Sequence, residues 1–202
     1  MIAIIDYGAG NLQSVKKALD FLGCESVVTS DSAVIDSASH IILPGVGSFG
    51  DAMDSIRARG LEETIQRAAN GERPFLGICL GLQLLFEHSD ESPDARGLGV
   101  FEGSIGLIPK NGGLKVPHMG WNSLEVTQPS GIFEGIESGT YFYFVHSYYL
   151  GNAKADEVAA LTHYGTEIQC AVQRGKVAAT QFHPEKSGEA GLRLLQNFIR
   201  EG

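Results

Sequence analysis

The sequence has few cysteines, a single tryptophan and no long apolar stretch. Its 202 residues include three cysteines, an odd and sparse set that is unlike the disulfide framework of a small secreted protein. No apolar run approaches the roughly 20 residues of a membrane-spanning helix, and the first residues lack the basic and apolar regions of a signal peptide. We therefore expect a cytoplasmic protein with no membrane association.

Positive charge is also scarce. Against 24 aspartates and glutamates stand 15 lysines and arginines, so that the formal net charge is −9. Such an acidic chain is a poor match for nucleic acid or an anionic membrane. The length suffices for a substantial core, and no repeat, low-complexity tract or linker divides the chain. We predict that residues 1–202 form a single domain.

The first half of the chain alternates between two patterns. Short continuous apolar runs, typical of strands covered on both faces of a sheet, predict strands at residues 2–5, 26–29, 40–43 and 75–78. Apolar residues at helical spacing predict helices at residues 11–22, 49–58, 61–70 and 80–87. This alternation indicates an α/β fold with a parallel sheet.

The second half has a different pattern. Short apolar or aromatic runs, separated by Gly, Pro, Asn and Asp, predict strands at residues 105–108, 124–126, 141–145, 158–162, 168–172 and 177–181. This spacing indicates hairpins or antiparallel additions to the sheet. A helix with an apolar stripe is predicted at residues 187–200.

Cys79 lies where a predicted strand meets a predicted helix, in the run Gly77-Ile78-Cys79-Leu80-Gly81. The arrangement is that of a nucleophile elbow, with sulfur in place of the hydroxyl. Such a turn presents the side chain at the top of a sheet, next to the backbone N–H of the following residue. A helix N-terminus also favours the thiolate form of a cysteine. We predict that Cys79 is a nucleophile.

A general base is predicted in His183-Pro184-Glu185, directly after the last predicted strand. Two residues two apart on an extended segment point the same way, and Pro184 disfavours helical geometry at His183. Beside a thiol, His183 can accept its proton while Glu185 fixes the tautomer of the ring. A lone histidine in a loop is more often structural, but the pairing with an elbow favours catalysis. The three groups would meet at the carboxyl ends of parallel strands.

A glycine-rich turn follows the third predicted strand, in Pro44-Gly45-Val46-Gly47. An oxyanion hole needs two N–H donors, one from the residue after the nucleophile and one from a loop of this kind. We predict that Leu80 supplies the first donor and the backbone at Val46 and Gly47 the second. Because glycines also occur in ordinary turns before helices, this segment alone favours neither interpretation.

Two motifs resemble those of class I (triad) glutamine amidotransferases: Gly77–Gln83, around the cysteine, and His183-Pro184-Glu185. Four further segments make the whole chain similar, within that class, to the glutaminase subunits of imidazole glycerol phosphate synthase: residues 6–11, 44–49, 115–122 and 143–148. The resemblance implies a single-domain, flavodoxin-like α/β fold. Its central sheet would be mostly parallel, with helices on both faces and antiparallel additions in the second half.

The resemblance also implies a function. A member of this family hydrolyses glutamine to glutamate and ammonia, with Cys79, His183 and Glu185 as the triad. The ammonia passes to a (β/α)₈-barrel cyclase subunit in a heterodimer. There it reacts with a ribotide to give imidazole glycerol phosphate, for histidine biosynthesis, and aminoimidazole carboxamide ribotide. No cofactor and no metal are implied.

Further site residues follow from the resemblance alone. Around the bound glutamine it puts Gly47, Gln83, Glu91, Ser147 and Tyr148. At the cyclase interface it puts Asn11, Trp121 and Asn122. The residues themselves predict a polar-aromatic loop at residues 117–122, and tryptophan is favoured at interfaces. The residues alone allow a different interpretation, in which Gln83 is a solvated helix residue, Glu91 is a charge on a surface loop and Trp121 anchors the local core.

Two other classes of protein remain open from the residues. One is a cysteine hydrolase of the peptidase or chaperone kind, against which Gln83 and the His-Pro-Glu motif argue. The other is a non-catalytic module, which is expected to lose its nucleophile or its base, whereas this chain has both. We also expect glutaminase activity to stay low until the cyclase binds its ligand, because the Gly45–Gly47 segment can hold the oxyanion donor in the wrong orientation.

Overall fold

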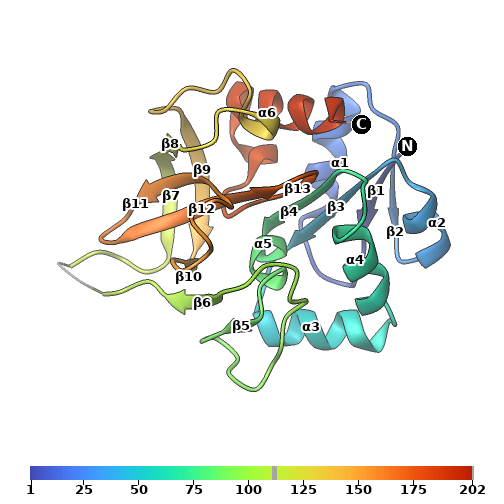
Figure 1. Cartoon of the computed structure of the whole chain (residues 1–202), viewed down its shortest axis with the longest axis horizontal. Coiled ribbons are helices and arrows are strands. Elements are labelled where there is room, and N and C mark those ends of the chain that lie inside the picture. The colour runs from blue at the N-terminus through green and yellow to red at the C-terminus, as the bar shows by residue number, and fades with distance from the viewer. Residues whose placement is uncertain (111–112, 202) are drawn as a thin grey trace.

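The computed structural model describes residues 1–110 and 113–201, and strands and helices alternate through its first half (Figure 1). These elements are β1 (Ile2–Ile5), α1 (Leu12–Phe21), β2 (Ser26–Thr29), α2 (Ser32–Ser37), β3 (His40–Gly45), α3 (Phe49–Ala58), α4 (Glu62–Ala69), β4 (Phe75–Cys79) and α5 (Leu80–Leu84). All of the predicted strands in this half form. The helix α2, capped by the Asp31 carboxylate, was not predicted from the sequence.

The second half consists mainly of strands. It contains β5 (His88–Ser89), β6 (Ser104–Leu107), β7 (His118–Ser123), β8 (Glu125–Val126), β9 (Tyr141–His146), β10 (Tyr148–Leu150), β11 (Val158–His163), β12 (Glu167–Arg174) and β13 (Val177–Thr180). Two 3₁₀ turns, η1 (Gly131–Phe133) and η2 (Pro184–Lys186), and the closing helix α6 (Gly188–Arg200) complete the described elements.

Eight strands form one sheet in the order β2-β1-β3-β4-β13-β12-β11-β8. The first five strands in this order, β2, β1, β3, β4 and β13, are parallel to one another. The last three, β12, β11 and β8, continue the sheet with antiparallel pairing. The predicted fold is therefore confirmed, including its antiparallel second half. In this register Gly45 pairs with Cys79, and Ile78 pairs with Thr180, so the carboxyl ends of β3, β4 and β13 lie side by side.

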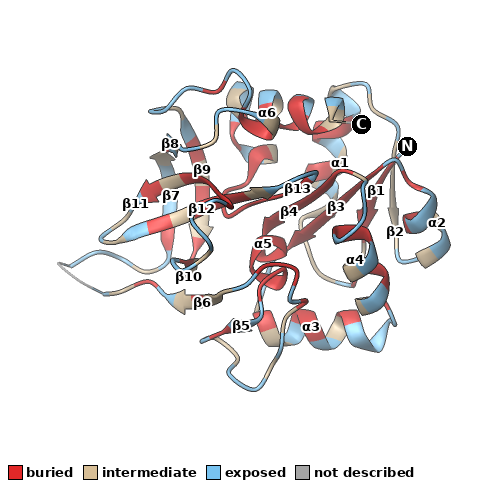
Figure 2. Ribbon diagram, in the orientation of Figure 1, coloured by how far each residue is buried: buried red, intermediate tan, exposed pale blue. Residues whose placement is uncertain are grey.

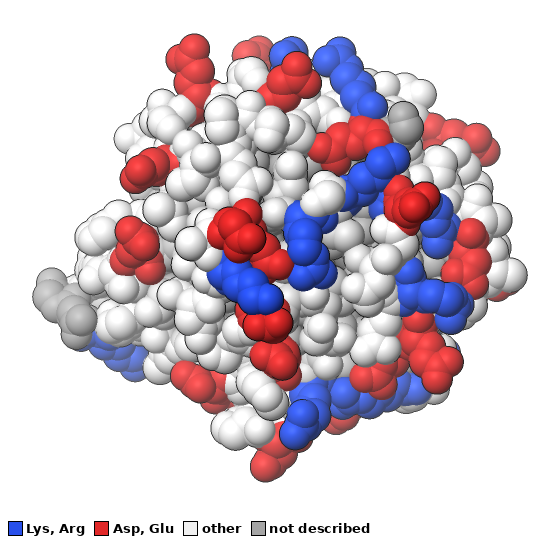
Figure 3. Space-filling view, viewed as in Figure 1, with Lys and Arg blue, Asp and Glu red and all other residues white. Residues whose placement is uncertain are grey.

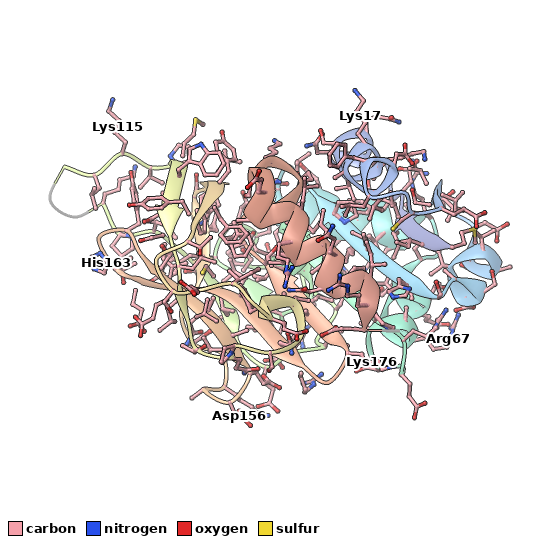
Figure 4. All side chains as sticks on the ribbon, turned by 90° about the horizontal axis from the view of Figure 1, so that it is seen from above. Lys17, Arg67, Lys115, Asp156, His163 and Lys176 are labelled. Carbon is pink, nitrogen blue, oxygen red and sulfur yellow. The ribbon has the colours of Figure 1, made fainter. Side chains whose placement is uncertain are left out.

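Helices cover both faces of the sheet. On one face, Val15 and Leu19 of α1 share a buried cluster with Leu195 of α6, and Figure 4 looks onto this face, with α6 lying across the sheet beside α1. On the other face, Met53 of α3 and Ile65 of α4 belong to a second buried cluster. Figure 2 shows the inner strands β1, β3 and β4 as buried, whereas the edge strand β2 is of intermediate exposure. This sandwich leaves only the strand ends and the connecting loops for a site.

Two smaller sheets extend from the main one. Strands β10, β6 and β5 form a three-stranded sheet, and β7 pairs with β9 in an antiparallel ribbon. The prediction of a loop at residues 117–122 was wrong, because residues 118–123 pair with β9 over six positions. The predicted helix at residues 80–87 ends at Leu84, because the carbonyls of Leu84 and Leu85 accept hydrogen bonds from Leu98 and Val100 instead of continuing the helix.

On the face shown in Figure 3, lysine and arginine side chains are interspersed with acidic ones rather than gathered into a basic patch. Some charged side chains of the protein form ion pairs, such as Arg57 with Glu62 and Lys154 with Glu102. Across residues 1–110 and 113–201, no helix combines the length and the apolar character that crossing a bilayer requires.

Candidate active site

The backbone at Cys79 has the geometry of a nucleophile elbow. Strand β4 ends at this residue and α5 begins at Leu80. Its φ is +57°, and it is the only non-glycine residue with positive φ in the part of the chain that the structure describes. Such a conformation costs on the order of 1–3 kcal/mol and persists only where the surroundings enforce it.

Glycines on either side make the elbow possible. A Cβ on Gly77 would lie 2.9 Å from the carbonyl oxygen of Gly81, and a Cβ on Gly81 would overlap the backbone carbonyl of Leu43. The strand, the turn and the helix therefore pack more closely than residues with side chains allow. This packing fixes the thiol at the end of the sheet.

His183 and Glu185 meet beside the elbow. The ring Nδ1 lies 2.8 Å from Glu185 Oε1, and the two side chains are 2% and 0% exposed. The sequence argument relied on an extended segment, but residues 184–186 instead form the 3₁₀ turn η2, which bends the carboxylate back onto the ring. The turn is held in place because Ser187 Oγ donates to the carbonyl of His183 over 2.7 Å.

The electrostatics of His183 favour its charged form. Burial lowers the pKa of the imidazole, but Cys79 and Glu185 outweigh burial and raise that pKa to about 9. The other ring nitrogen, Nε2, is buried and hydrogen-bonds none of the residues that the structure describes. The ring is thus held at one nitrogen by a carboxylate, and the second nitrogen remains available on the thiol side.

A cavity of about 340 Å³ opens at these side chains. Its lining comes from the ends of β3, β4 and β9 and from the loops around them: Val46, Gly47, Cys79, Leu80, Gln83, Glu91, Pro117, Val145, His146, Ser147, Tyr148 and His183. The structure thus brings together every residue expected at the thiol, at the oxyanion hole and around the glutamine, except Glu185, which lies behind His183. Asn11, Trp121 and Asn122 lie outside this lining.

Free backbone N–H groups line one side of the cavity. Gly47 has a φ of +96°, which a glycine adopts readily. Within the described chain, the N–H groups of Val46 and Gly47 have no hydrogen-bond acceptor. Leu80 is the first residue of α5, so its N–H has no acceptor within the helix. This set of donors is suited to a developing negative charge on oxygen.

Glu91 connects the cavity to the helix that follows this loop. Its Oε2 accepts a hydrogen bond of 2.8 Å from the backbone N–H of Phe49, at the start of α3, and Ser92 Oγ accepts one from Gly50. Glu91 is therefore no isolated surface charge, because one carboxylate oxygen caps α3 while the side chain lines the cavity.

Gln83 is buried, at 5% exposure, and is not a solvated helix residue. Its Nε2 donates to the carbonyl of Tyr148 and to Gln181 Oε1, each over 3.0 Å. Both N–H groups of this amide are thereby used, and its Oε1 is left to accept from a ligand in the cavity.

Gln181 is a site residue that the sequence reasoning missed. Its Nε2 lies 3.7 Å from Cys79 Sγ. The available signal was its position two residues before His183, directly after the last strand. A contact across two strands that are distant in sequence cannot be read from a local motif.

Two buried histidines connect the cavity to the β7–β9 ribbon. Burial lowers the pKa of His118 to about 4 and that of His146 to about 3, so both rings are neutral. The carbonyl of Tyr148 can only accept, so His146 Nδ1 carries the proton that it shares with this oxygen over 2.9 Å. His146 Nε2 then accepts from His118 Nδ1 over 2.9 Å, and His118 Nε2 accepts from Asn122 Nδ2 over 3.4 Å.

The same ribbon has an exposed apolar side. Met119 is 62% exposed, Trp121 55% and Tyr141 59%, while His118 and Phe144 on the opposite side are buried. Trp121 therefore does not anchor the local core. Asn11, the third residue expected at an interface, lies near the triad, where its Nδ2 donates to Glu185 Oε1 over 3.4 Å.

The fold and this site define a class of protein. The family model described as "Glutamine amidotransferase class-I" matches residues 3–201. A solved structure titled "Crystal structure of glutamine amidotransferase" covers 100% of the chain and 98% of its own with a TM-score of 0.77, and the structure of PurLQS from Thermotoga maritima gives 0.74 with coverages of 98% and 97%. At 24% and 23% sequence identity, these two show the fold alone.

Curated relatives are much more similar. "Imidazole glycerol phosphate synthase subunit HisH" from Syntrophotalea carbinolica is 50% identical over 203 residues, with 98% of both chains covered. The subunit of the same name from Rhodopirellula baltica is 51% identical, with 98% of this chain and 96% of its own covered. The chain belongs to the family of these subunits, within the class I glutamine amidotransferases.

Proposed function

We propose that this protein hydrolyses glutamine to glutamate and ammonia, and that it delivers the ammonia to the cyclase subunit of imidazole glycerol phosphate synthase. The observation that carries the proposal is the thiol of Cys79, which faces the same cavity as His183, Gln83 and Glu91. The shared names of the relatives support the assignment of the partner. The family match over residues 3–201 supports treating residues 1–202 as one domain.

In the first half-reaction, the thiolate of Cys79 attacks the side-chain amide carbon of glutamine. A carbon–sulfur bond forms, and the carbonyl electron pair moves onto the oxygen, where the N–H groups of Leu80 and of the Val46–Gly47 segment stabilise it. The imidazolium of His183 gives its proton to the amide nitrogen. The carbon–nitrogen bond then breaks, and ammonia leaves a thioester behind.

In the second half-reaction, neutral His183 takes a proton from water while the hydroxide attacks the thioester carbon. The carbon–sulfur bond breaks, the thiolate of Cys79 is restored beside an imidazolium, and glutamate leaves after losing the proton of its new carboxyl group. Glu185 orients the ring in both steps.

The remaining polar groups of the cavity bind the substrate in this proposal. The carboxylate oxygen of Glu91 that does not cap α3 would accept from the substrate ammonium. Gln83 Oε1 would accept a second hydrogen bond. Gly47, Ser147 and Tyr148 complete the contacts, and the reaction uses no cofactor or metal.

We assign the cyclase-facing surface to the ribbon that carries Trp121, with Asn11 and Asn122 beside it. Aromatic side chains that are exposed on one side of a ribbon are typical anchors of protein interfaces. A heterodimer also suits the chemistry, because ammonia must stay unprotonated to remain a nucleophile, and an enclosed path keeps it out of water. Both subunits would act in the cytoplasm.

A glutaminase assay tests the proposal. Glutamate production is measured with the chain alone, with the cyclase subunit, and with the cyclase subunit and its ribotide. We expect the chain alone to have low glutaminase activity and the mixture with the cyclase subunit and its ribotide to be much more active. The Cys79→Ala variant should produce no glutamate in either case. Activity toward peptides only, or full activity in Cys79→Ala, would overturn the proposed function, and equal turnover in all mixtures would overturn the proposed dependence on the partner.

A further inference from the structure

Gln181 presents an amide group to the sulfur of Cys79 from inside the protein. The residue follows directly on β13 and is fully buried, and its Nε2 lies 3.7 Å from Cys79 Sγ. A hydrogen bond from a buried amide to sulfur stabilises the thiolate, because the donor is fixed and no water competes for it.

The hydrogen-bond network determines which atom of this amide faces the sulfur. A backbone carbonyl only accepts, so the atom of Gln83 that contacts the carbonyl of Tyr148 must be its nitrogen. The same nitrogen contacts Gln181, whose contacting atom must therefore be the oxygen. The remaining atom of the Gln181 amide, next to Cys79, is consequently the nitrogen.

Gln181 is held at both ends. Its backbone N–H donates to the carbonyl of Cys170 over 2.8 Å, which continues the pairing of β13 with β12. Its side-chain oxygen is held by Gln83 over 3.0 Å. The donor therefore points at the sulfur before any substrate arrives, and no reorganisation is needed when charge develops there.

The thiol has one contact of the opposite kind. The carbonyl of Val145 lies 3.9 Å from Cys79 Sγ and can accept the S–H proton, which favours the neutral thiol. A negative sulfur is repelled by this oxygen. The N–H of Gln181 offsets that repulsion, because it interacts more strongly with the thiolate than with the thiol.

Titratable side chains near the thiol come from several elements: His183, His146, Glu91 and Tyr148 line the same cavity, and Tyr7 lies next to Gly45. His183 favours the thiolate, since Cys79 and Glu185 raise its pKa to about 9 against the effect of burial. Burial raises the pKa of Tyr7 far above its usual value, with a further contribution from Cys79, so the phenol stays neutral. Burial lowers the pKa of His146 to about 3, so this ring stays neutral as well.

We infer that Gln181 is a further catalytic residue of the glutaminase site, whose amide N–H stabilises the thiolate of Cys79 before the attack on glutamine and again when the carbon–sulfur bond of the thioester breaks. The inference rests on the proposed function in one respect, which is that Cys79 is the nucleophile. With His183, Gln181 gives the thiolate a second stabilising group.

The test replaces Gln181 by methionine, which has a similar volume but cannot donate. The rate of alkylation of Cys79 by iodoacetamide is followed against pH on the full chain, with the labelled cysteine identified by mass spectrometry. We expect Gln181→Met to react roughly 10- to 100-fold more slowly near neutral pH, as for the loss of a hydrogen bond to a charged group. Its pH profile should be displaced to higher pH, and in the complex with the cyclase subunit kcat should fall more than KM rises.

A matched control is Gln173→Met. Gln173 pairs with Ala178, toward the end of the sheet away from Cys79, and its Oε1 accepts from the N–H of Ile132 over 3.2 Å. This variant also loses a side-chain hydrogen bond, while Gln181→Met loses those to Gln83 and Cys79. The alkylation profile of Gln173→Met should match that of the unmodified chain. A wild-type profile in Gln181→Met would overturn the inference and leave Gln181 as a packing residue.

If Gln181→Met does not fold, the unmodified chain still decides the question. In NMR spectra recorded against pH, the side-chain N–H resonances of Gln181 should shift over the same pH range in which the alkylation rate changes. Resonances that stay constant over that range would overturn the inference. Alkylation needs no glutamine, so its result is independent of the glutaminase assay. A chain without glutaminase activity but with the expected profiles would refute the proposed function while supporting the effect of Gln181 on the thiol.

Discussion

Tyr7→Phe is expected to stabilise the protein. The ring of Tyr7 follows β1 into a buried cluster and is 0% exposed, and its hydroxyl makes no hydrogen bond within the described chain. A buried polar group without a partner costs about 1–3 kcal/mol. Removing the oxygen should therefore raise the free energy of unfolding by about 1–2 kcal/mol, since the ring keeps its packing. For a chain of this length, each kcal/mol corresponds to about 2–4 °C in Tm.

Urea denaturation with linear extrapolation measures the effect, and a second tyrosine provides the control. Tyr164 Oη donates to the carbonyl of Lys115 over 2.8 Å, so Tyr164→Phe should lower the free energy of unfolding by about 0.5–1.5 kcal/mol. The two variants remove the same atom and are expected to have opposite signs. A Tyr7→Phe protein that is less stable than the unmodified chain would refute the reasoning, because it would show that the hydroxyl has a partner.

Two further variants probe the backbone and the ion pair of the site. In Gly45→Ala, at the end of β3, the new Cβ would lie 2.6 Å from Tyr7 Oη and 2.8 Å from Leu80 Cβ. We expect the free energy of unfolding to fall by about 1–3 kcal/mol in urea denaturation. An unchanged value would contradict the close packing of the elbow. In Glu185→Gln, the glutaminase rate should fall by roughly 10⁴-fold, as when a triad acid becomes an amide. Folding raises the pKa of His183 from 6.5 to about 9. The protonated ring therefore contributes to the free energy of unfolding in full below pH 6.5, and this contribution is lost as the pH rises to about 9. Glu185→Gln should reduce this decline in denaturation experiments across that range, and an identical decline would contradict the role of the carboxylate.

The inner strands of the parallel sheet, β1, β3, β4 and β13, could be predicted because each is buried and contains a continuous, mainly apolar run. Strand β7 could not, because Met119 and Trp121 face outward while Gly120 and Asn122 break the apolar alternation. It becomes a strand only through pairing with β9. A contact with a partner strand that lies far along the chain leaves no local pattern.

The residues of the candidate site likewise include some that could be predicted from the sequence and some that could not. Cys79 and His183 could be predicted because glycines, proline and charged neighbours surround them within a few residues. Gln181 could not, since its significance depends on Gln83 and Tyr148 together. The distortion of residues 184–186 into a 3₁₀ turn was missed because proline fixes the residue before it but leaves Glu185 free to turn.

The place of β13 in the sheet has a consequence for the synthesis of the chain. It is the last strand in the sequence, yet it lies between β4 and β12. While the ribosome is making the protein, the edge of β4 that carries Cys79 stays open until residues 177–180 have emerged. The nascent chain therefore contains Cys79 before it contains His183, and the triad can assemble only after the last strand has been made. Translation that stalls before β13 should leave a chain with an unpaired strand edge, which is a target for aggregation and for chaperones.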